Sequence, residues 1–232
     1  RDRRNTKYVV VTPENRSDFS YEKCSQKLGQ VLFIKPARQG SSVGIYKVQN
    51  AAEFERALTD AFNYDYKVMV EEAIQGPREV ECSVLGNRNP KASKLGAIEI
   101  PTGDEFYDYN NKFVDASGVV FDLPVDLPED LAAEITQMSL DAFKILDNRG
   151  LARMDFLVDQ NNVPYFGEVN TLPGFTNISL YPQLWKVSGI EYSELLDQLI
   201  QLAIDEFNDN AKLHYDFVEL GKEKLPDSLK KK

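Results

Sequence analysis

Histidine, cysteine and long apolar runs are scarce in this 232-residue sequence, and each scarcity excludes a class of protein. The single histidine, His214, lies near the C-terminus and is expected to be structural, and no Ser/His/Asp or Cys/His catalytic motif is recognisable. No apolar run approaches the roughly 20 residues of a membrane-spanning helix, and no signal peptide is recognisable. Basic residues are outnumbered, and the net charge of −10 argues against nucleic acid as a partner.

The two cysteines, Cys24 and Cys82, form no close-spaced metal motif. We interpret them as buried, reduced thiols of a cytoplasmic protein, while a single disulfide between them stays open. The composition is that of a globular protein, 42% hydrophobic and 28% charged, with enough length for one large or two small domains. Because the sequence starts without an initiator methionine, we expect a fragment of a longer protein.

Strand and helix patterns follow one another along the chain, without an internal repeat. The expected strands cover residues 7–11, 30–37, 67–74, 78–87, 93–100, 151–159 and 163–170. The expected helices cover residues 20–29, 50–64, 128–146 and 193–207. In the third helix the predicted buried stripe comprises Leu131, Ile135, Met138, Ala142 and Ile145. These patterns predict an α+β fold with antiparallel strand pairs and packed helices.

Two segments lack a regular pattern. Residues 101–118 are rich in turn formers, and a structureless run of this length inside a domain is typical of a functional loop or lid. Residues 213–232 are expected to form a solvated tail.

The stretch "FIKPARQGSSVG" at residues 33–44 has glycines and serines after an apolar strand. Its lysine, Lys35, precedes the glycines, whereas the familiar nucleotide loop places lysine after them. An ammonium group beside successive N–H groups can hold an anion, and glycine allows the backbone to approach it. The stretch is either an ordinary turn or a different cradle for a triphosphate.

An acidic hairpin at residues 151–170 carries the most specific pattern. With a two-residue turn at Asn161-Asn162, Asp155 lies opposite Glu168, and Arg153 shares the face of Asp155. Like charges directly opposite each other destabilise a sheet unless a cation lies between them. The apolar neighbours Phe156, Val158 and Phe166 are expected on the other face, which favours a polar cleft that binds a divalent metal over two carboxylates in solvent.

Together these segments resemble the ATP-grasp superfamily, and within it the D-alanine–D-alanine ligases. The resemblance covers residues 31–204 and rests on five motifs in the family's order: "IKPARQGSSVG", "VEEAIQGPREVECSVLGN", "EFYDYNNKF", "ARMDF" and "FGEVNTLPGFTNISLYP". It implies two subdomains whose mainly antiparallel sheets clasp ATP. The implied division is a central subdomain at 1–75 and a C-terminal subdomain at 76–212, with 101–118 as its omega loop.

The resemblance also implies how ATP is held. Lys35 and Lys112 would contact the phosphates under a glycine–serine loop. Glu71 would accept from the adenine amino group, and the backbone of residues 72–74 would pair with the ring edge. The implied ATP-binding residues are Lys35, Gly40, Ser41, Ser42, Glu71, Glu72, Ala73, Ile74, Glu79 and Lys112.

Further motif matches imply the catalytic and metal sites. The implied ligands of two Mg²⁺ or Mn²⁺ ions are Asp155, Glu168 and Asn170. Arg153 would stabilise developing charge, and the Gly174 N–H would point at the tetrahedral oxyanion. The implied catalytic residues are Arg153, Gly174 and Ser41, with Ser41 hydrogen-bonded to Glu79. The implied substrate residues are Phe113, Ser179 and Leu180, of which Ser179 would hold the second substrate's carboxylate.

The implied reaction is ATP-dependent ligation of D-alanine, through an acyl phosphate, for peptidoglycan precursor synthesis. The family usually has Lys-Tyr where this chain has Lys112-Phe113, and phenylalanine there goes with ligases that accept D-lactate. We therefore expect D-lactate as second substrate, as in vancomycin-tolerant bacteria, with a neutral exchange in a D-alanine–D-alanine ligase as the alternative.

The resemblance also shows a departure, since the family's N-terminal domain has no counterpart here. We expect weak or no turnover by this chain alone, and a homodimer for the parent enzyme. Two other functions stay open: a different ATP-grasp carboxylate–amine ligase, and a non-catalytic nucleotide-binding module.

Overall fold

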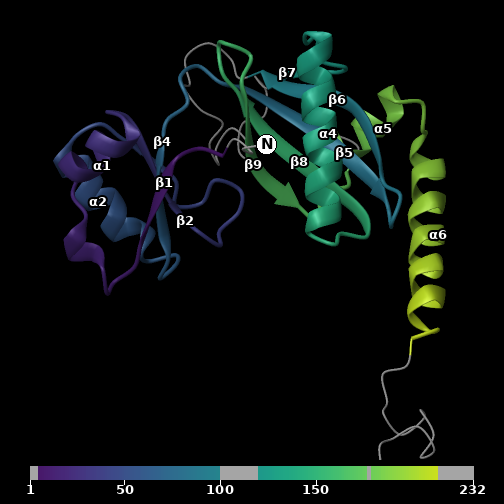
Figure 1. Ribbon diagram of the computed structural model, residues 1–232, viewed down its shortest axis with the longest axis horizontal. Helices are drawn as coiled ribbons and strands as arrows, with labels where there is room; N and C mark the ends of the chain where they lie inside the picture. The colour runs from purple at the N-terminus through teal and green to yellow at the C-terminus, as the bar shows by residue number, and fades with distance from the viewer. Residues whose placement is uncertain (1–4, 100–119, 177–178, 214–232) are drawn as a thin grey trace, which may run out of the picture.

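The computed structural model describes residues 5–99, 120–176 and 179–213, which build two antiparallel sheets joined by a short connector (Figure 1). The omega loop with Lys112 and Phe113, His214 and nearly all of the tail lie outside the described residues. The α+β expectation is confirmed, because every described strand pairing is antiparallel and helices cover both sheets. None of the helices in the described part of the chain combines the length and the hydrophobicity that a transmembrane span requires.

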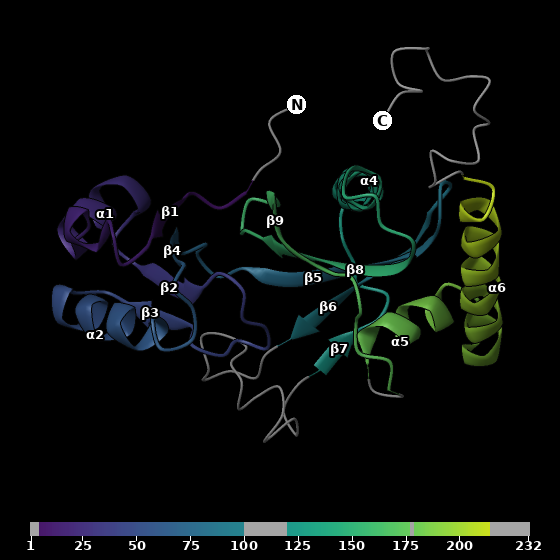
Figure 2. The ribbon, with the colours of Figure 1, turned by 90° about the horizontal axis from the view of Figure 1, so that it is seen from below.

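The first sheet has four strands in the order β1-β4-β2-β3. Its strands are β1 (Tyr8–Val11), β2 (Leu32–Pro36), β3 (Tyr46–Val48) and β4 (Val68–Glu72). Figure 2 shows two helices on the side of this sheet that faces away from the second sheet, α1 (Tyr21–Leu28) and α2 (Ala51–Ala61).

Local signals in the sequence explain where these two helices begin and end. The Ser20 side chain accepts the Lys23 N–H at the start of α1, and Gly29 follows its end with φ 99°, which favours glycine. At the start of α2, Asn50 accepts the Glu53 N–H, and Glu53 in turn accepts the Gln49 N–H. The helices pack their apolar sides on the sheet in one buried cluster around Phe54. The first sheet therefore has its own core.

The second sheet has five strands in the order β7-β6-β5-β8-β9. Its strands are β5 (Arg78–Gly86), β6 (Lys91–Glu99), β7 (Val120–Asp122), β8 (Gly150–Val158) and β9 (Pro164–Asn170). The helices of this half are α4 (Glu129–Ile145), α5 (Leu180–Val187) and α6 (Tyr192–Asn210). Figure 2 shows α4 on one face of the sheet, α5 on the other, and α6 at the end remote from the first sheet.

Alternation along β5 and β8 divides the second sheet into an apolar and a polar face. Val80, Cys82, Val84, Ala152, Met154, Phe156 and Val158 pack in one cluster with α4. The intervening residues point to the opposite face, and those of β5 are Glu79, Glu81 and Ser83. The sheet therefore presents acids on the side not covered by α4.

The predicted stripe of α4 is only partly right. Leu131 and Ile135 are buried as expected, but the buried row continues through Ser139 and Phe143, and Ile145 is 60% exposed. Residues four apart form a single ridge on a helix, and here that ridge meets the sheet. Met138 and Ala142 pack only at its margin.

The sequence patterns missed the short elements β3, β7 and α5, which have three, three and eight residues. The three residues of β3 and of β7 are too few to show a period. Cys24 and Cys82 are buried and free, which confirms the expectation of unpaired thiols and decides against the disulfide. Burial raises the pKa of the Cys82 thiol to about 11.

Candidate active site

A cleft of about 450 Å³ lies between the two sheets, beside the connector from β4 to β5. Its size is in the range of small-molecule sites. It is lined by Thr6, Val31, Phe33, Lys35, Ile45, Lys47, Glu71, Glu72, Ala73, Ile74, Gln75, Gly76, Pro77, Glu79 and Leu157. Six predicted ATP-binding residues are in this set: Lys35, Glu71, Glu72, Ala73, Ile74 and Glu79.

The wall formed by the first sheet is polarised. Glu71 is directly opposite Phe33 in the β2–β4 register, and only 7% of Glu71 is exposed. The Lys35 ammonium lies 2.5 Å from a Glu71 carboxylate oxygen, so the buried acid is neutralised by an ion pair. Alternation along β2 places Phe33 and Lys35 on the same face. The cleft thus offers an aromatic surface between charged groups of both signs.

The connector supplies backbone groups to the same cleft. The Glu72 N–H donates to the Lys7 carbonyl and the Ala73 N–H donates to the Val31 carbonyl, at 3.0 and 3.2 Å. These two amides are therefore engaged within the protein. A ligand edge at this segment would meet the connector's carbonyl groups and the Ile74 amide.

The glycine–serine loop after β2 has an unusual backbone. The Val43 N–H donates to the Gly40 carbonyl around Ser41 and Ser42, whose φ angles are 55° and 59°. Successive left-handed residues other than glycine store strain, which is typical of ligand-binding loops. Gly44 has φ 74°, and an added Cβ would approach the Tyr64 ring at 2.8 Å. Gly40, Ser41 and Ser42 do not line the cleft in this conformation.

The base of this loop is fixed by a buried acid. Asp65 accepts from the Arg38 backbone N–H at 2.9 Å and from its guanidinium at 3.1 and 2.5 Å. The Arg38 guanidinium, which also lies over the Tyr66 ring, lowers the pKa of Asp65 from 3.8 to about 2. Ala37 donates its N–H to the Lys67 carbonyl beside it. The loop is therefore anchored where it leaves the strand.

The hairpin of β8 and β9 places Asp155 directly opposite Glu168, and Arg153 opposite Asn170, as predicted. The predicted two-residue turn is wrong: Val158 pairs with Pro164, and a three-residue turn at 160–162 follows Asp159. A bulge between Asp155 and Phe156 shifts the register back by one residue. The two deviations cancel, which is why the register at the acids is correct.

The extra residue of this bulge is Gly167, between the Glu168 and Phe166 pairings. A Cβ at Gly167 would lie 3.0 Å from the Asp155 carbonyl oxygen, so glycine suits the close approach of the strands. In a regular strand Phe166 and Glu168 would share a face. The bulge instead turns Phe166 against Phe156, with ring centroids 5.2 Å apart, while Glu168 stays beside Asp155.

The polar ends of the hairpin residues converge on one point. Arg153 donates to both Asp155 oxygens at 2.8 Å. The Asn170 amide donates to Asp155 at 2.8 Å and to Glu168 at 3.1 Å. A carboxylate that was not predicted, Glu81 on β5, lies 2.8 Å from the Arg153 Nε. Burial alone would lower the pKa of Arg153, but the hydrogen bonds to Asp155 and the charges of Asp155, Glu81 and Glu168 raise it.

This cluster fits a divalent cation. Three carboxylates, Glu81, Asp155 and Glu168, face one guanidinium, so three negative charges and one positive charge leave a formal charge of −2. One amide bridges Asp155 and Glu168, and an Asn170 amide rotated by 180° would present oxygen in place of nitrogen. Oxygen donors of this kind are those Mg²⁺ prefers. Among the described residues, no three His, Cys, Asp or Glu side chains group tightly enough to hold a metal by themselves, so Asn170 is needed to complete the set.

The loop after β9 brings Gly174 and Ser179 together. A Cβ at Gly174 would lie 3.0 Å from the Ser179 hydroxyl, which accepts the Thr176 N–H at 3.0 Å. Ser179 precedes α5, where N–H groups favour a negative charge. Leu180 is only 5% exposed, so its side chain packs in the interior, and its contact with a substrate stays a prediction.

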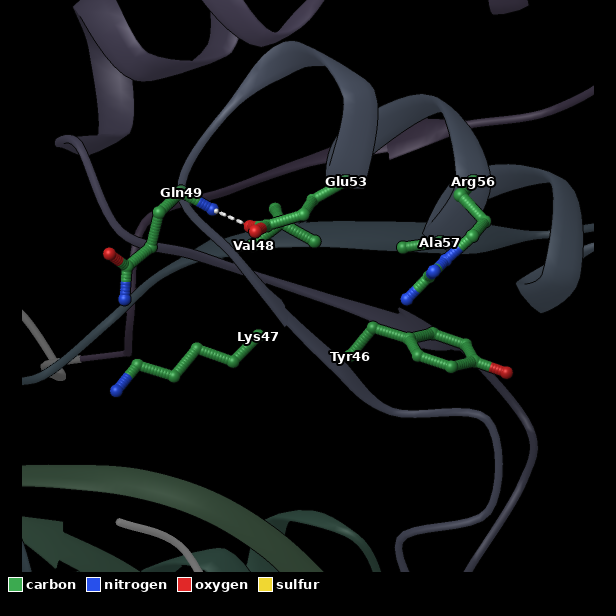
Figure 3. A pocket seen from close by; sticks show the side chains of 7 residues that line it. All are labelled: Tyr46, Lys47, Val48, Gln49, Glu53, Arg56 and Ala57. Atoms are coloured by element: carbon green, nitrogen blue, oxygen red, sulfur yellow. Dashed lines mark hydrogen bonds between the residues drawn. The ribbon is translucent and has the colours of Figure 1, made fainter.

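A second hollow, of about 350 Å³, lies between β3 and α2 (Figure 3). Glu53 is already engaged there by the Gln49 N–H at 2.8 Å. Figure 3 shows the Lys47 side chain extending away from α2, and Lys47 also lines the first cleft. The groups of the second hollow do not converge, whereas those of the first do.

Two antiparallel sheets that enclose a cleft, with Lys35 and Glu71 in the wall of the first sheet and Glu79 in the wall of the second, fit an ATP-grasp fold. Solved structures agree: a D-alanine–D-alanine ligase from Coxiella burnetii matches with a TM-score of 0.76 and 37% identity, over 91% of this chain and 56% of that one. The VanG D-Ala:D-Ser ligase from Enterococcus faecalis matches with a TM-score of 0.74 and 34% identity, over 86% and 57%.

The family model for the D-Ala–D-Ala ligase C-terminus matches residues 4–201, and the chain belongs to this family. The chain is 76% identical to a D-alanine–D-alanine ligase of Ligilactobacillus salivarius, over 96% of the chain and 59% of that relative. It thus spans about three fifths of the length of this curated relative.

Proposed function

We propose that this chain is the nucleotide- and metal-binding part of an ATP-dependent ligase that joins D-alanine to a second D-acid, in peptidoglycan precursor synthesis. The observation that carries the proposal is the Asp155–Glu168–Asn170 cluster with Arg153 on the second sheet, together with the Lys35–Glu71 pair that lines the cleft on the first sheet. The name of the relative at 76% identity supports the reaction class. The two subdomains are proposed at 1–75 and 76–212.

In this proposal adenine packs on Phe33 and donates its amino group to Glu71, beside the connector at 72–74. Lys35 would turn from Glu71 toward the phosphates, with Gly40, Ser41, Ser42 and Lys112 closing over them and Glu79 lining the same cleft. Asp155, Glu168 and Asn170 would hold two Mg²⁺ or Mn²⁺ ions. Bound there, the ions neutralise the charge of the transferring phosphoryl group.

The chain's own residues would then serve the transfer and the attack. The D-alanine carboxylate attacks the γ-phosphorus of ATP, ADP leaves and an acyl phosphate forms, while Arg153 would stabilise the charge that develops on the phosphoryl group. The second substrate attacks the acyl carbon and phosphate leaves. Gly174 would donate its N–H to the tetrahedral oxyanion, and Ser179 would hold the second carboxylate. No nucleophilic side chain is required.

D-lactate is the second substrate that Phe113 favours, and we propose it alongside D-alanine. A phenyl ring cannot donate or accept the hydrogen bond that a tyrosine hydroxyl makes. A hydroxy acid lacks the ammonium group of D-alanine, so this change alters the polar groups that select between them. A parent enzyme that forms only D-Ala-D-Ala at neutral pH, with D-lactate in excess, would rule out this preference. The homodimer and the cytoplasmic location are likewise proposals for the parent protein.

Nucleotide binding by this chain is tested by calorimetric titration of a non-hydrolysable ATP analogue with Mg²⁺. Lys35→Met should weaken binding by about tenfold or more, because one charge-assisted contact to phosphate is lost. Lys27→Met, at an exposed position of helix α1, is the matched control and should bind like the wild type. Equal affinities for the wild type and Lys35→Met would refute the placement of the phosphates.

A further inference from the structure

Glu81 occupies a central position that the proposed reaction does not use. On β5 it is directly opposite Asp155 of β8, and Asp155 is directly opposite Glu168 of β9. Three carboxylates thus form one row across three strands. Like charges in adjacent positions of a sheet repel, so a positive charge is needed between Glu81 and Asp155 and another between Asp155 and Glu168.

Arg153 supplies the positive charge between Glu81 and Asp155. Its Nε lies 2.8 Å from a Glu81 oxygen and 2.8 Å from Asp155 Oδ1, and its second nitrogen lies 2.8 Å from Asp155 Oδ2. The side chains of Glu81, Arg153 and Asp155 are 6%, 20% and 21% exposed. Glu81 is therefore the deepest member of the trio, and Asp155 the one that solvent and ligands reach.

Asp155 cannot accept both hydrogen bonds from Arg153 and bind a divalent cation at the same time. In this structure both of its oxygens accept from Arg153, and Oδ2 also accepts from Asn170. A divalent cation between Asp155 and Glu168 would compete for the same lone pairs. Once Asp155 turned to the cation, Arg153 would lose its bidentate partner and be repelled by the new positive charge.

We propose that Glu81 is a positioning residue, which keeps the Arg153 guanidinium at the site when Asp155 turns to a divalent cation. This inference rests on the proposed metal site. Glu81 is suited to the role because strand β5 fixes its backbone between β6 and β8, and burial keeps water from replacing its contact. With Glu81 in place, Arg153 exchanges one carboxylate for another and stays where charge develops during transfer.

The test follows the Arg153 Nε–H by nitrogen-15 NMR of the full chain, with its resonance assigned by its disappearance in Arg153→Lys. Its exchange with solvent is measured with and without Mg²⁺ and a non-hydrolysable ATP analogue. In the wild type the N–H should stay protected in both states. In Glu81→Leu it should be protected without metal, through Asp155, and exchange about tenfold faster or more with metal, as one charge-assisted hydrogen bond is lost.

Two further variants make the result specific. Glu81→Gln keeps an acceptor without the charge, so its exchange should lie between those of the wild type and Glu81→Leu, and it carries the test if the leucine variant does not fold. Ser83→Ala, at the next position on the same face of β5 and opposite Arg153, is the matched control and should behave as the wild type.

Two results would overturn the inference in different ways. An exchange rate that is unaffected by metal in Glu81→Leu and Glu81→Gln, while Mg²⁺ shifts the β8 and β9 resonances, would reject the role of Glu81 alone. A wild type whose β8 and β9 resonances do not respond to Mg²⁺ and analogue would reject the proposed metal site, and the role of Glu81 with it.

Discussion

The Arg38–Asp65 anchor of the glycine–serine loop makes a quantitative prediction about stability. The pKa of Asp65 falls from 3.8 to about 2, and a tenfold change in an acid's dissociation constant corresponds to roughly 1.4 kcal/mol. Since the Arg38 side chain is 62% exposed, solvent screening reduces the expected contribution to about 1 kcal/mol. Because the folded pKa is depressed, this stability is fully present above about pH 4 and is lost as the pH falls through 2.

Urea unfolding of the wild type and Asp65→Asn, at pH 7 and at pH 2.5, measures this contribution. The variant should be less stable by about 1 kcal/mol at pH 7, with a smaller difference at pH 2.5. Glu55→Gln is the matched control, because Glu55 pairs with Arg16 at 3.3 Å on the exposed surface, and it should change stability by less than about 0.5 kcal/mol at either pH. A difference for Asp65→Asn that is the same at both pH values would refute the electrostatic account.

Three more variants or reagents test other parts of the structure. Gly167→Val forces the bulge open beside the Asp155 carbonyl, so it should abolish Mg²⁺-dependent stabilisation by the ATP analogue, and retention of that stabilisation would contradict the role of the bulge. Gly44→Ala adds a Cβ 2.8 Å from Tyr64 at φ 74°, so it should lower the free energy of unfolding by about 1–3 kcal/mol in urea titrations, and no change would contradict the clash. The Cys82 thiol is fully buried with a pKa raised to about 11, so thiol reagents at pH 8 should modify it only after unfolding; prompt labelling of the native protein would contradict its burial.

Alternation in the sequence predicted the faces of β8, because Arg153 and Asp155 share a parity that any regular strand preserves. Along β9 alternation alone would put Phe166 on the face of Glu168, and the bulge at Gly167 moves it to the opposite face. Alternation could not predict the length of the turn between β8 and β9. A two-residue turn and a three-residue turn with a compensating bulge put Asp155 opposite Glu168 equally well, and only the contact of Phe166 with Phe156 distinguishes them.

The sequence also could not predict which distant strands pair with each other. The alternation of β5 does show that Glu81 lies on the polar face with Glu79, but nothing local states that β5 pairs with β8 in the register that brings Glu81 to Arg153. The burial of the Leu180 side chain at the start of α5 was likewise not predicted, because it depends on packing between elements, and its contact with a substrate stays a prediction.

In the proposed function, the cleft binds a nucleotide through a divalent metal held by β8 and β9. The most direct test is thermal unfolding of this chain with a non-hydrolysable ATP analogue, with and without Mg²⁺, for the wild type and Glu168→Gln. At one hundred times its dissociation constant a ligand stabilises by about 2.7 kcal/mol, which raises the melting temperature of a chain this long by about 5–10 °C. We expect this rise in melting temperature only with Mg²⁺, and we expect it to be lost in Glu168→Gln. An equal rise in Glu168→Gln, or one that is independent of Mg²⁺, would contradict it.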